Sequence, residues 1–294
     1  MNPFSFQHGK AGELAQLPHV HEFALTKNHT VQFDTFPCVA SNTLRLYYIL
    51  EGKFEWLIDR NANVLYPGDV AVVLPGQEIG GAKGFLDIGT LFCLHLEAGV
   101  SKKGNIVLGK WSGLSRNDRN AIGEILAVSN LKVLKMGEAL HFFQQLYSEI
   151  AEHELGYVTR VNHLLDSLLI LVTRQSKLQS TSRRDPPELM LQLEQVLRNN
   201  LAYQWTVEEM ASLFGLGTTA FTQKVKRCTG FSPANYLIKI RISETIKMLK
   251  RTSANVTDIA LETGFYSSQH FSTTFKKFTG YTPGEFRRRN AEKV

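Results

Sequence analysis

The sequence predicts an α+β protein of two domains, with an N-terminal β-barrel followed by helices and an all-helical C-terminal domain. Three observations lead to this prediction. Short β-rich segments separated by turns run from residue 23 to residue 96, apolar residues recur at helical spacing after residue 108, and the last third of the chain repeats one phrase. With 294 residues, the chain is long enough for two domains that each have their own core.

The β-rich part contains four recognisable segments. "TLRLYYILEGKFEWLID" consists of two β-rich runs around Glu51 and Gly52, which is a hairpin signal, and "DRNANV" is a second turn. In "LYPGDVAVVLPGQ" two Pro-Gly pairs flank an apolar strand from Val70 to Leu74, and "FLDIGTLFCLHL" is a late strand. Many short strands at this spacing are typical of a sandwich or barrel.

Three helical segments follow: "SRNDRNAIGEILAVS", "GEALHFFQQLYSEIAEHE" and "VTRVNHLLDSLLILVTRQ". The last has one wide apolar stripe, formed by Leu164, Leu165, Leu168, Leu169 and Val172. Such a stripe packs a helix on its own domain or forms a dimer seam, and both readings stay open for different parts of it.

The polar segment "SKLQSTSRRDPP" predicts a linker. The predicted organisation is therefore a β domain at 1–105, a helical region with a dimerisation role at 106–175, a linker at 176–187 and a helical domain at 188–294.

The positive charge is confined to the last third of the chain. Residues 1–185 carry 18 Lys+Arg and 18 Asp+Glu, whereas residues 186–294 carry 15 and 9, so the net charge of +6 belongs to the C-terminal domain. A basic module joined to a neutral one is typical of a nucleic-acid binder. The start of the chain lacks a secretory pattern, and no apolar run approaches the ~18 residues of a membrane span. The three cysteines are widely spaced, so we expect a cytoplasmic protein without a membrane partner.

The repeated phrase is "KRCTGFSP" at 226–233 and "KKFTGYTP" at 276–283. Upstream of it, "VEEMASLFG" at 207–215 aligns with "VTDIALETG" at 256–264. Each copy reads as a short helix that ends at a glycine, followed by a second helix that Thr218 or Thr219 caps in the first copy and Ser267 or Ser268 in the second.

The second helix of each copy has an apolar pair at i,i+4, Phe221 with Val225 and Phe271 with Phe275. This pattern predicts helix-turn-helix units at 206–230 and 255–280, joined by a long helix at 233–250.

Two such units joined by one long helix resemble the DNA-binding domain of the AraC/XylS bacterial transcription regulators. The residues that carry the resemblance are "VEEMASLFGL", "FTQKVKRCTGFSPANYLIKIRI" and "VTDIALETGFYSSQHFSTTFKKFTGYTPGEFR", within roughly 190–290. More weakly, "LRLYYILEGKFEWLID" and "LYPGDVAVVLPG" resemble the cupin-like regulatory domain that this family often carries. The resemblance implies a cupin-like β-barrel that senses a small molecule.

The recognition helices are expected to enter the major groove with the face opposite the apolar pairs. The resemblance places base contacts on this face, and Gln, Ser and Thr side chains can read base edges. Lys226 and Lys276 are expected to meet phosphates. The predicted DNA-binding residues are Thr219, Thr222, Gln223, Lys226, Ser268, Gln269, Ser272, Thr273 and Lys276. His270 is expected to meet DNA or pack on the turn.

The rival class for the N-terminal domain is a metal-dependent enzyme. His19 and His21 form an H-x-H, but the positions where metal-type relatives often carry histidines hold Ser41 and Ile79. We therefore predict no enzyme, no metal and no cofactor. Strand alternation gives four inward candidates for a ligand pocket in the barrel, for each of which a structural role is also open: Arg45, Tyr47, Trp56 and His95.

The sequence thus predicts a transcription regulator that binds double-stranded DNA, with a small-molecule effector and a homodimeric state. If it is an activator, RNA polymerase is a further partner. The alternative is a small-molecule-binding cupin whose basic helical domain docks a protein.

Overall fold

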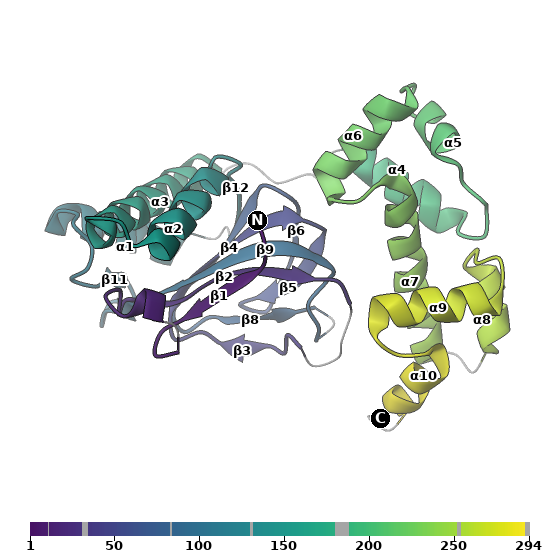
Figure 1. Ribbon diagram of the computed structural model, residues 1–294, viewed down its shortest axis with the longest axis horizontal. Coiled ribbons are helices and arrows are strands. Elements are labelled where there is room, and N and C mark those ends of the chain that lie inside the picture. Colours follow the sequence, from purple (N-terminus) through teal and green to yellow (C-terminus); the bar gives the residue numbers. More distant parts are fainter. Residues whose placement is uncertain are drawn as a thin grey trace. The chain divides into compact units, whose positions relative to one another are not determined.

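A computed structural model describes residues 1–294 except 11, 31–34, 83, 130–131, 180–187, 252–253 and 292–294 (Figure 1). The chain divides into two compact units, one consisting of residues 1–28 and 33–183 and the other of residues 29–32 and 184–294. The first unit is α+β and the second is helical, as predicted.

The strands of the first unit pair in antiparallel fashion and form two sheets and a small ribbon. The six-stranded sheet has the order β1 (Phe4–Gln7), β2 (Val20–Asn28), β9 (Gly89–Leu96), β4 (Leu44–Glu51), β7 (Asp69–Val73) and β12 (Val133–Lys135). The four-stranded sheet has the order β3 (Val39–Ala40), β8 (Glu78–Gly81), β5 (Phe54–Ile58) and β6 (Asn61–Leu65). A small ribbon pairs β10 (Ala98–Val100) with β11 (Ile106–Leu108).

The predicted hairpin around Gly52 is wrong, because its two strands belong to different sheets. Strand β4 pairs with β7 and β9, whereas β5 pairs with β6 and β8. The chain turns a corner at Gly52, which has φ 98° and lies so close to the chain that an added Cβ would be 2.5 Å from the carbonyl oxygen of Ile88. The predicted second turn does form a hairpin, β5–β6, through Asp59 and Arg60 in the left-handed region.

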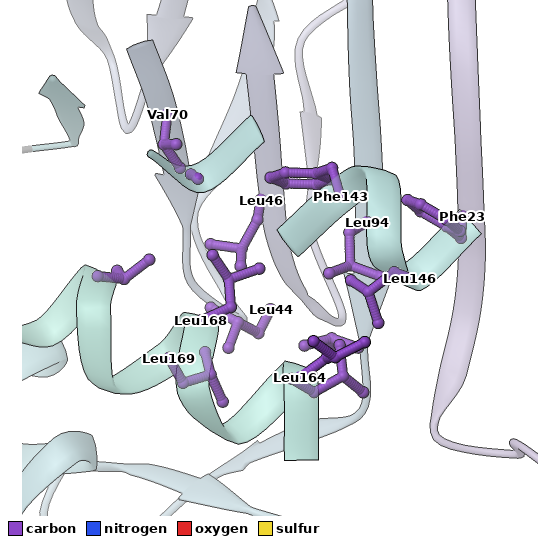
Figure 2. Packing of buried hydrophobic residues seen from close by; sticks show 14 of the residues in the cluster. Phe23, Leu44, Leu46, Val70, Leu94, Phe143, Leu146, Leu164, Leu168 and Leu169 are labelled. Carbon is purple, nitrogen blue, oxygen red and sulfur yellow. The ribbon is translucent and has the colours of Figure 1, made fainter. Parts of the chain in front are cut away.

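The six-stranded sheet is buried on both faces. Between the two sheets lies an apolar core that includes Tyr47, Phe54, Trp56 and Leu91. The other face packs against the helices α1 (Arg116–Val128), α2 (Ala139–Glu152) and α3 (Tyr157–Gln179). Figure 2 shows side chains of this second core, which come from the strands and from the helices: Phe23, Leu44, Leu46, Val70, Leu94, Phe143, Leu146, Leu164, Leu168 and Leu169.

The apolar stripe of α3 is part of this core. Leu165, Leu168, Leu169 and Val172 are fully buried and Leu164 is 6% exposed within the single chain. The stripe therefore packs within its own domain and is not exposed for a dimer seam, so the structure contradicts the second of the two readings.

The predicted boundaries also shift. Strands β11 and β12 lie in the stretch expected to be helical, and β12 joins the main sheet, so the 106–175 region is continuous with the β domain. Helix α3 continues through Gln179 with Ser176 buried, so the first residues of the predicted linker are helical. Residues 180–187 of that linker lie outside the described residues.

The second unit consists of seven helices in its described residues. In chain order they are α4 (Glu188–Asn199), α5 (Val207–Ser212), α6 (Thr218–Thr229), α7 (Pro233–Arg251), α8 (Val256–Glu262), α9 (Ser268–Thr279) and α10 (Pro283–Ala291). Figure 1 shows the long α7 with α5 and α6 toward one end and α8 and α9 toward the other. Of the helices that the structure describes, none combines the length and apolar character that crossing a bilayer requires.

Candidate nucleic-acid interface and ligand pocket

The repeated phrase closes the second helix of each unit in the same way. The hydroxyl of Thr229 donates to the carbonyl of Val225 at 2.8 Å, and that of Thr279 donates to the carbonyl of Phe275 at 2.8 Å. Both threonines are fully buried, and each makes a second bond just beyond the glycine that follows. Gly230 and Gly280 take the left-handed C-cap, with φ 76° and 77°. The repetition thus encodes one helix-ending motif twice.

The start of the second helix differs between the units. Ser267 caps α9, with its hydroxyl accepting from the backbone N–H of His270 at 3.1 Å. In the first unit the N-cap is Gly217, without a side-chain bond, so the expectation that Thr218 or Thr219 caps α6 is wrong. Both threonines instead belong to the helix.

Helices α6 and α9 each bury one face and expose the other. Phe221, Val225, Phe271 and Phe275 are fully buried, as the i,i+4 pairing predicts. The nine residues predicted to contact DNA are all exposed or half-buried on the remaining surface: Thr219, Thr222, Gln223, Lys226, Ser268, Gln269, Ser272, Thr273 and Lys276. Each recognition helix therefore presents a polar surface ending in a lysine.

A buried arginine helps to join the two helix-turn-helix units, and no local sequence pattern indicates this role. Arg241 of α7 is 6% exposed and donates to the carbonyls of Leu201 (3.1 Å) and Tyr203 (2.7 Å). Gln204, in the same loop before α5, donates to the carbonyl of Gly264 in the second unit at 3.0 Å. Besides α7 itself, this loop joins the two helix-turn-helix units.

Two further residues have structural contacts. The ring of His270 lies 5.6 Å from that of Phe265 and 6.1 Å from that of Tyr266, so this histidine packs on the turn. Arg287 donates to the carbonyl of Ala254 at 2.6 Å, directly before α8 begins. These contacts within the domain account for the positions of His270 and Arg287 without any contact to DNA.

The first unit has a cavity of about 720 Å³ at one end of the paired strands β2, β9 and β4. Of the four effector candidates, Arg45 and His95 line it, whereas Tyr47 and Trp56 lie deeper in the core between the sheets. The lining residues are His8, Pro18, His21, Asn42, Thr43, Arg45, His95, Glu97 and Ala98. The wall is therefore rich in hydrogen-bonding side chains and carries one cation, Arg45, and one anion, Glu97.

His95 is held by contacts on both ring nitrogens. Its Nδ1 lies 3.1 Å from a carboxylate oxygen of Glu22, and its Nε2 lies 3.2 Å from the hydroxyl of Tyr47. The contact with His95 lowers the pKa of Glu22, whereas burial raises the pKa of Tyr47 to about 12. Burial also raises the pKa of the nearby Cys93 thiol to about 12. Glu22 is thus ionised beside a neutral tyrosine and thiol at neutral pH.

The H-x-H of the sequence is split between two environments. His19 is 4% exposed and stacks on Trp111 at 4.9 Å, and burial lowers its pKa to about 4. His21 is exposed and lines the cavity. Glu22 and Cys93 were not among the candidates from the sequence, although the Cys-x-His spacing on one strand places Cys93 and His95 on the same face.

Comparison with known proteins gives the following matches. Residues 210–289 match the helix-turn-helix domain family. The HTH-type transcriptional activator RhaS of Enterobacter sp. (strain 638) is 30% identical over 151 residues, covering 49% of this chain and 54% of the relative. RhaS of Escherichia coli O9:H4 (strain HS) is 31% identical over 143 residues, covering 49% and 51%. The chain spans about half the length of the curated relatives it matches.

Two solved structures also align with the chain. The DNA-binding domain of AdpA, in complex with a target DNA, covers 37% of this chain and 96% of its own, with 22% identity and a TM-score of 0.34. ToxT from Vibrio cholerae covers 90% of this chain and 98% of its own, with 14% identity and a TM-score of 0.36.

The repeated unit, its buried pairs and the long helix between the copies define a double helix-turn-helix protein. This C-terminal domain is similar to the helix-turn-helix domain of AraC/XylS-type transcription regulators.

Proposed function

We propose that the chain is a sequence-specific DNA-binding transcription regulator that acts in the cytoplasm. The observation that carries the proposal is the pair of equivalent polar surfaces on α6 and α9, each opposite a buried apolar face. Both belong to the domain that holds the net charge of +6. Two recognition helices in successive major grooves would read two short motifs about 34 Å apart on one face of the duplex.

The residues divide into two proposed roles. Gln223 and Gln269 are exposed amides that can pair in bidentate fashion with adenine, so we assign them to base readout. Lys226 and Lys276 are exposed cations near the helix ends, and we assign them to phosphates, which position the domain without reading sequence. The hydroxyl residues between them complete the reading surface: Thr219, Thr222, Ser268, Ser272 and Thr273.

The test is selection of bound sequences from a random duplex pool by the full chain. Recovery of two short motifs one helical turn apart supports reading by both units, and recovery of one motif restricts readout to a single unit. Recovery of nothing above background at low salt overturns DNA recognition.

The alternative, docking of a protein by the basic domain, separates from DNA binding by salt dependence. Contacts with several phosphates make log K fall with log[salt] with a slope of about −0.9 per phosphate, whereas an apolar protein contact is nearly insensitive. The exposed polar surfaces of α6 and α9 favour DNA.

An effector is proposed for the cavity beside Arg45 and His95. A ligand acts there by binding more tightly to the DNA-competent arrangement or to the incompetent one. A homodimer and, because the relatives above are transcriptional activators, contact with RNA polymerase are further proposals. Light scattering and transcription from a selected operator in vitro test these two.

A further inference from the structure

Glu22, Cys93 and His95 form a compact group of metal-ligand types inside the β domain. In the pairing of β2 with β9, Glu22 stands opposite His95, and Ala24 stands opposite Cys93. The three side chains emerge on one face of the sheet, and one donor atom from each lies within 4.8 Å of the other two. Cys93 is 7% exposed, whereas Glu22 and His95 are half-buried.

In contrast to the sequence-based prediction of no metal, we propose that Glu22, Cys93 and His95 bind a zinc ion. Sulfur, imidazole nitrogen and carboxylate oxygen together make up the donor set that Zn²⁺ accepts, whereas Mg²⁺ and Ca²⁺ take oxygen alone. A tetrahedral Zn²⁺ with bonds of about 2.0–2.3 Å holds its ligand atoms about 3.3–3.8 Å apart. The donor atoms lie within 4.8 Å of one another, so the widest spacing has to shorten by up to about 1 Å for this geometry.

The surroundings of His95 fit a ligand role. Histidines that bind a metal through one nitrogen usually have a hydrogen-bond partner at the other, and Tyr47 occupies that position at 3.2 Å from Nε2. Zn²⁺ would then replace the direct contact between Nδ1 and Glu22.

Three protein ligands leave a fourth coordination position for water or a small molecule. Because His95 also lines the cavity of about 720 Å³, an ion and its fourth ligand have a route from solvent. Arg45 pairs with His95 across β4 and β9, and its positive charge disfavours a cation there. Metal binding displaces the proton of the Cys93 thiol, so the carboxylate and the resulting thiolate carry two negative charges against the one of Arg45.

The test is titration of the full chain with Co²⁺ as a spectroscopic probe, followed by competition with Zn²⁺. One equivalent of Co²⁺ should produce a thiolate-to-metal charge-transfer band that Zn²⁺ removes. Cys93→Ser should abolish the band. Glu22→Gln and His95→Gln should weaken affinity by more than about 100-fold, since loss of a group that only hydrogen-bonds to a metal ligand already costs about 10–100-fold. Cys38→Ser and His163→Gln, at an exposed cysteine and an exposed histidine, should leave binding unchanged.

Two results overturn the site: absence of the band in the unsubstituted chain, or equal affinity in Glu22→Gln and in the two control variants. Glu22→Gln keeps the size of a half-buried side chain, so it still tests the site if Cys93→Ser fails to fold. Circular dichroism of the helices and strands reports whether each variant folds. The measurement involves no DNA, so its failure leaves the proposed regulator function standing.

Discussion

In the first helix-turn-helix unit the turn glycine, Gly215, has open space where a Cβ would stand, whereas its counterpart Gly264 lies against α7 and the loop before α5. Both glycines have positive φ, 62° and 83°. At the start of the second helix the N-cap is Gly217, without a side-chain bond, in the first unit and Ser267, with such a bond, in the second. The two copies of one motif are therefore anchored differently.

The comparison separates two roles of residues in the repeat, one shared by both copies and one that differs between them. The residues that occur in both copies, such as Thr229 and Thr279, close each helix and leave the polar face free. The residues that differ set how each unit is held, with Arg241 and Gln204 fixing the turn of the second. Changes around that turn should lower the stability of the domain, whereas changes on the polar faces should alter DNA binding alone.

The largest expected effect comes from Gly264→Ala. Positive φ costs Ala about 1–2 kcal/mol, and overpacking adds about 1–3 kcal/mol because the Cβ would meet the carbonyl of Leu201 and lie 2.6 Å from the guanidinium of Arg241. The free energy of unfolding should fall by about 2–5 kcal/mol, as measured by urea unfolding followed by the helical circular dichroism signal.

Gly215→Ala is the matched control. It carries the positive-φ strain without the close approach, so the expected loss is about 1–2 kcal/mol. Equal losses at Gly215 and Gly264 would show that the contact with α7 does not distinguish the units.

Arg241→Lys should rank second. A lysine has no planar fork, so it cannot reproduce both bonds to the carbonyls of Leu201 and Tyr203, and loss of one charge-assisted bond costs about 1.5–3 kcal/mol. Binding to a selected two-motif duplex should weaken more than binding to either motif alone, since the spacing between units is loosened. Gel-shift titrations with the three duplexes measure this.

The control is Arg289→Lys, at an exposed arginine of the same helical domain that donates to the hydroxyl of Tyr281 at 3.1 Å. Because exposed charged contacts contribute only about 0–1 kcal/mol, little stability should be lost. A loss as large as that of Arg241→Lys would remove the special role of the buried arginine.

Local periodicity was enough to predict the helix-turn-helix units and their buried pairs, because i,i+4 spacing and helix-stopping glycines act within a few residues. The apolar runs around Gly52 were identified as strands, but their partners depended on β7 and β9, far along the chain, so the hairpin was wrong. The grouping of Glu22 with Cys93 and His95 likewise needs strand register, which periodicity does not supply. The hydrogen bonds of Arg241 go to a loop 40 residues earlier, so no local sequence pattern indicates them.

Changes on the polar faces should act on specificity. Gln269→Ala should cost about 1–3 kcal/mol of binding to the preferred duplex and relax the preference at one base, and Gln223→Ala should do the same in the other motif. Lys276→Gln, the contrast, should weaken all duplexes alike and reduce the salt slope by about 1. Identical profiles for the glutamine and lysine variants across a panel of duplexes would refute the division into base and phosphate contacts.

The smallest expected effect tests the N-caps. Ser267→Ala removes the acceptor for the N–H of His270 and should destabilise the domain by about 1 kcal/mol. Gly217→Ser should stabilise it by a few tenths of a kcal/mol, because Gly217 already has an extended conformation and open space around it. Urea unfolding of both variants measures the pair. If Gly217→Ser raised the stability as much as Ser267→Ala lowered it, Gly217 would be a poor cap that the domain tolerates. A small gain would mean that the backbone alone starts α6 well. The two helix-turn-helix units would then differ in how they are anchored far more than in how their second helices begin.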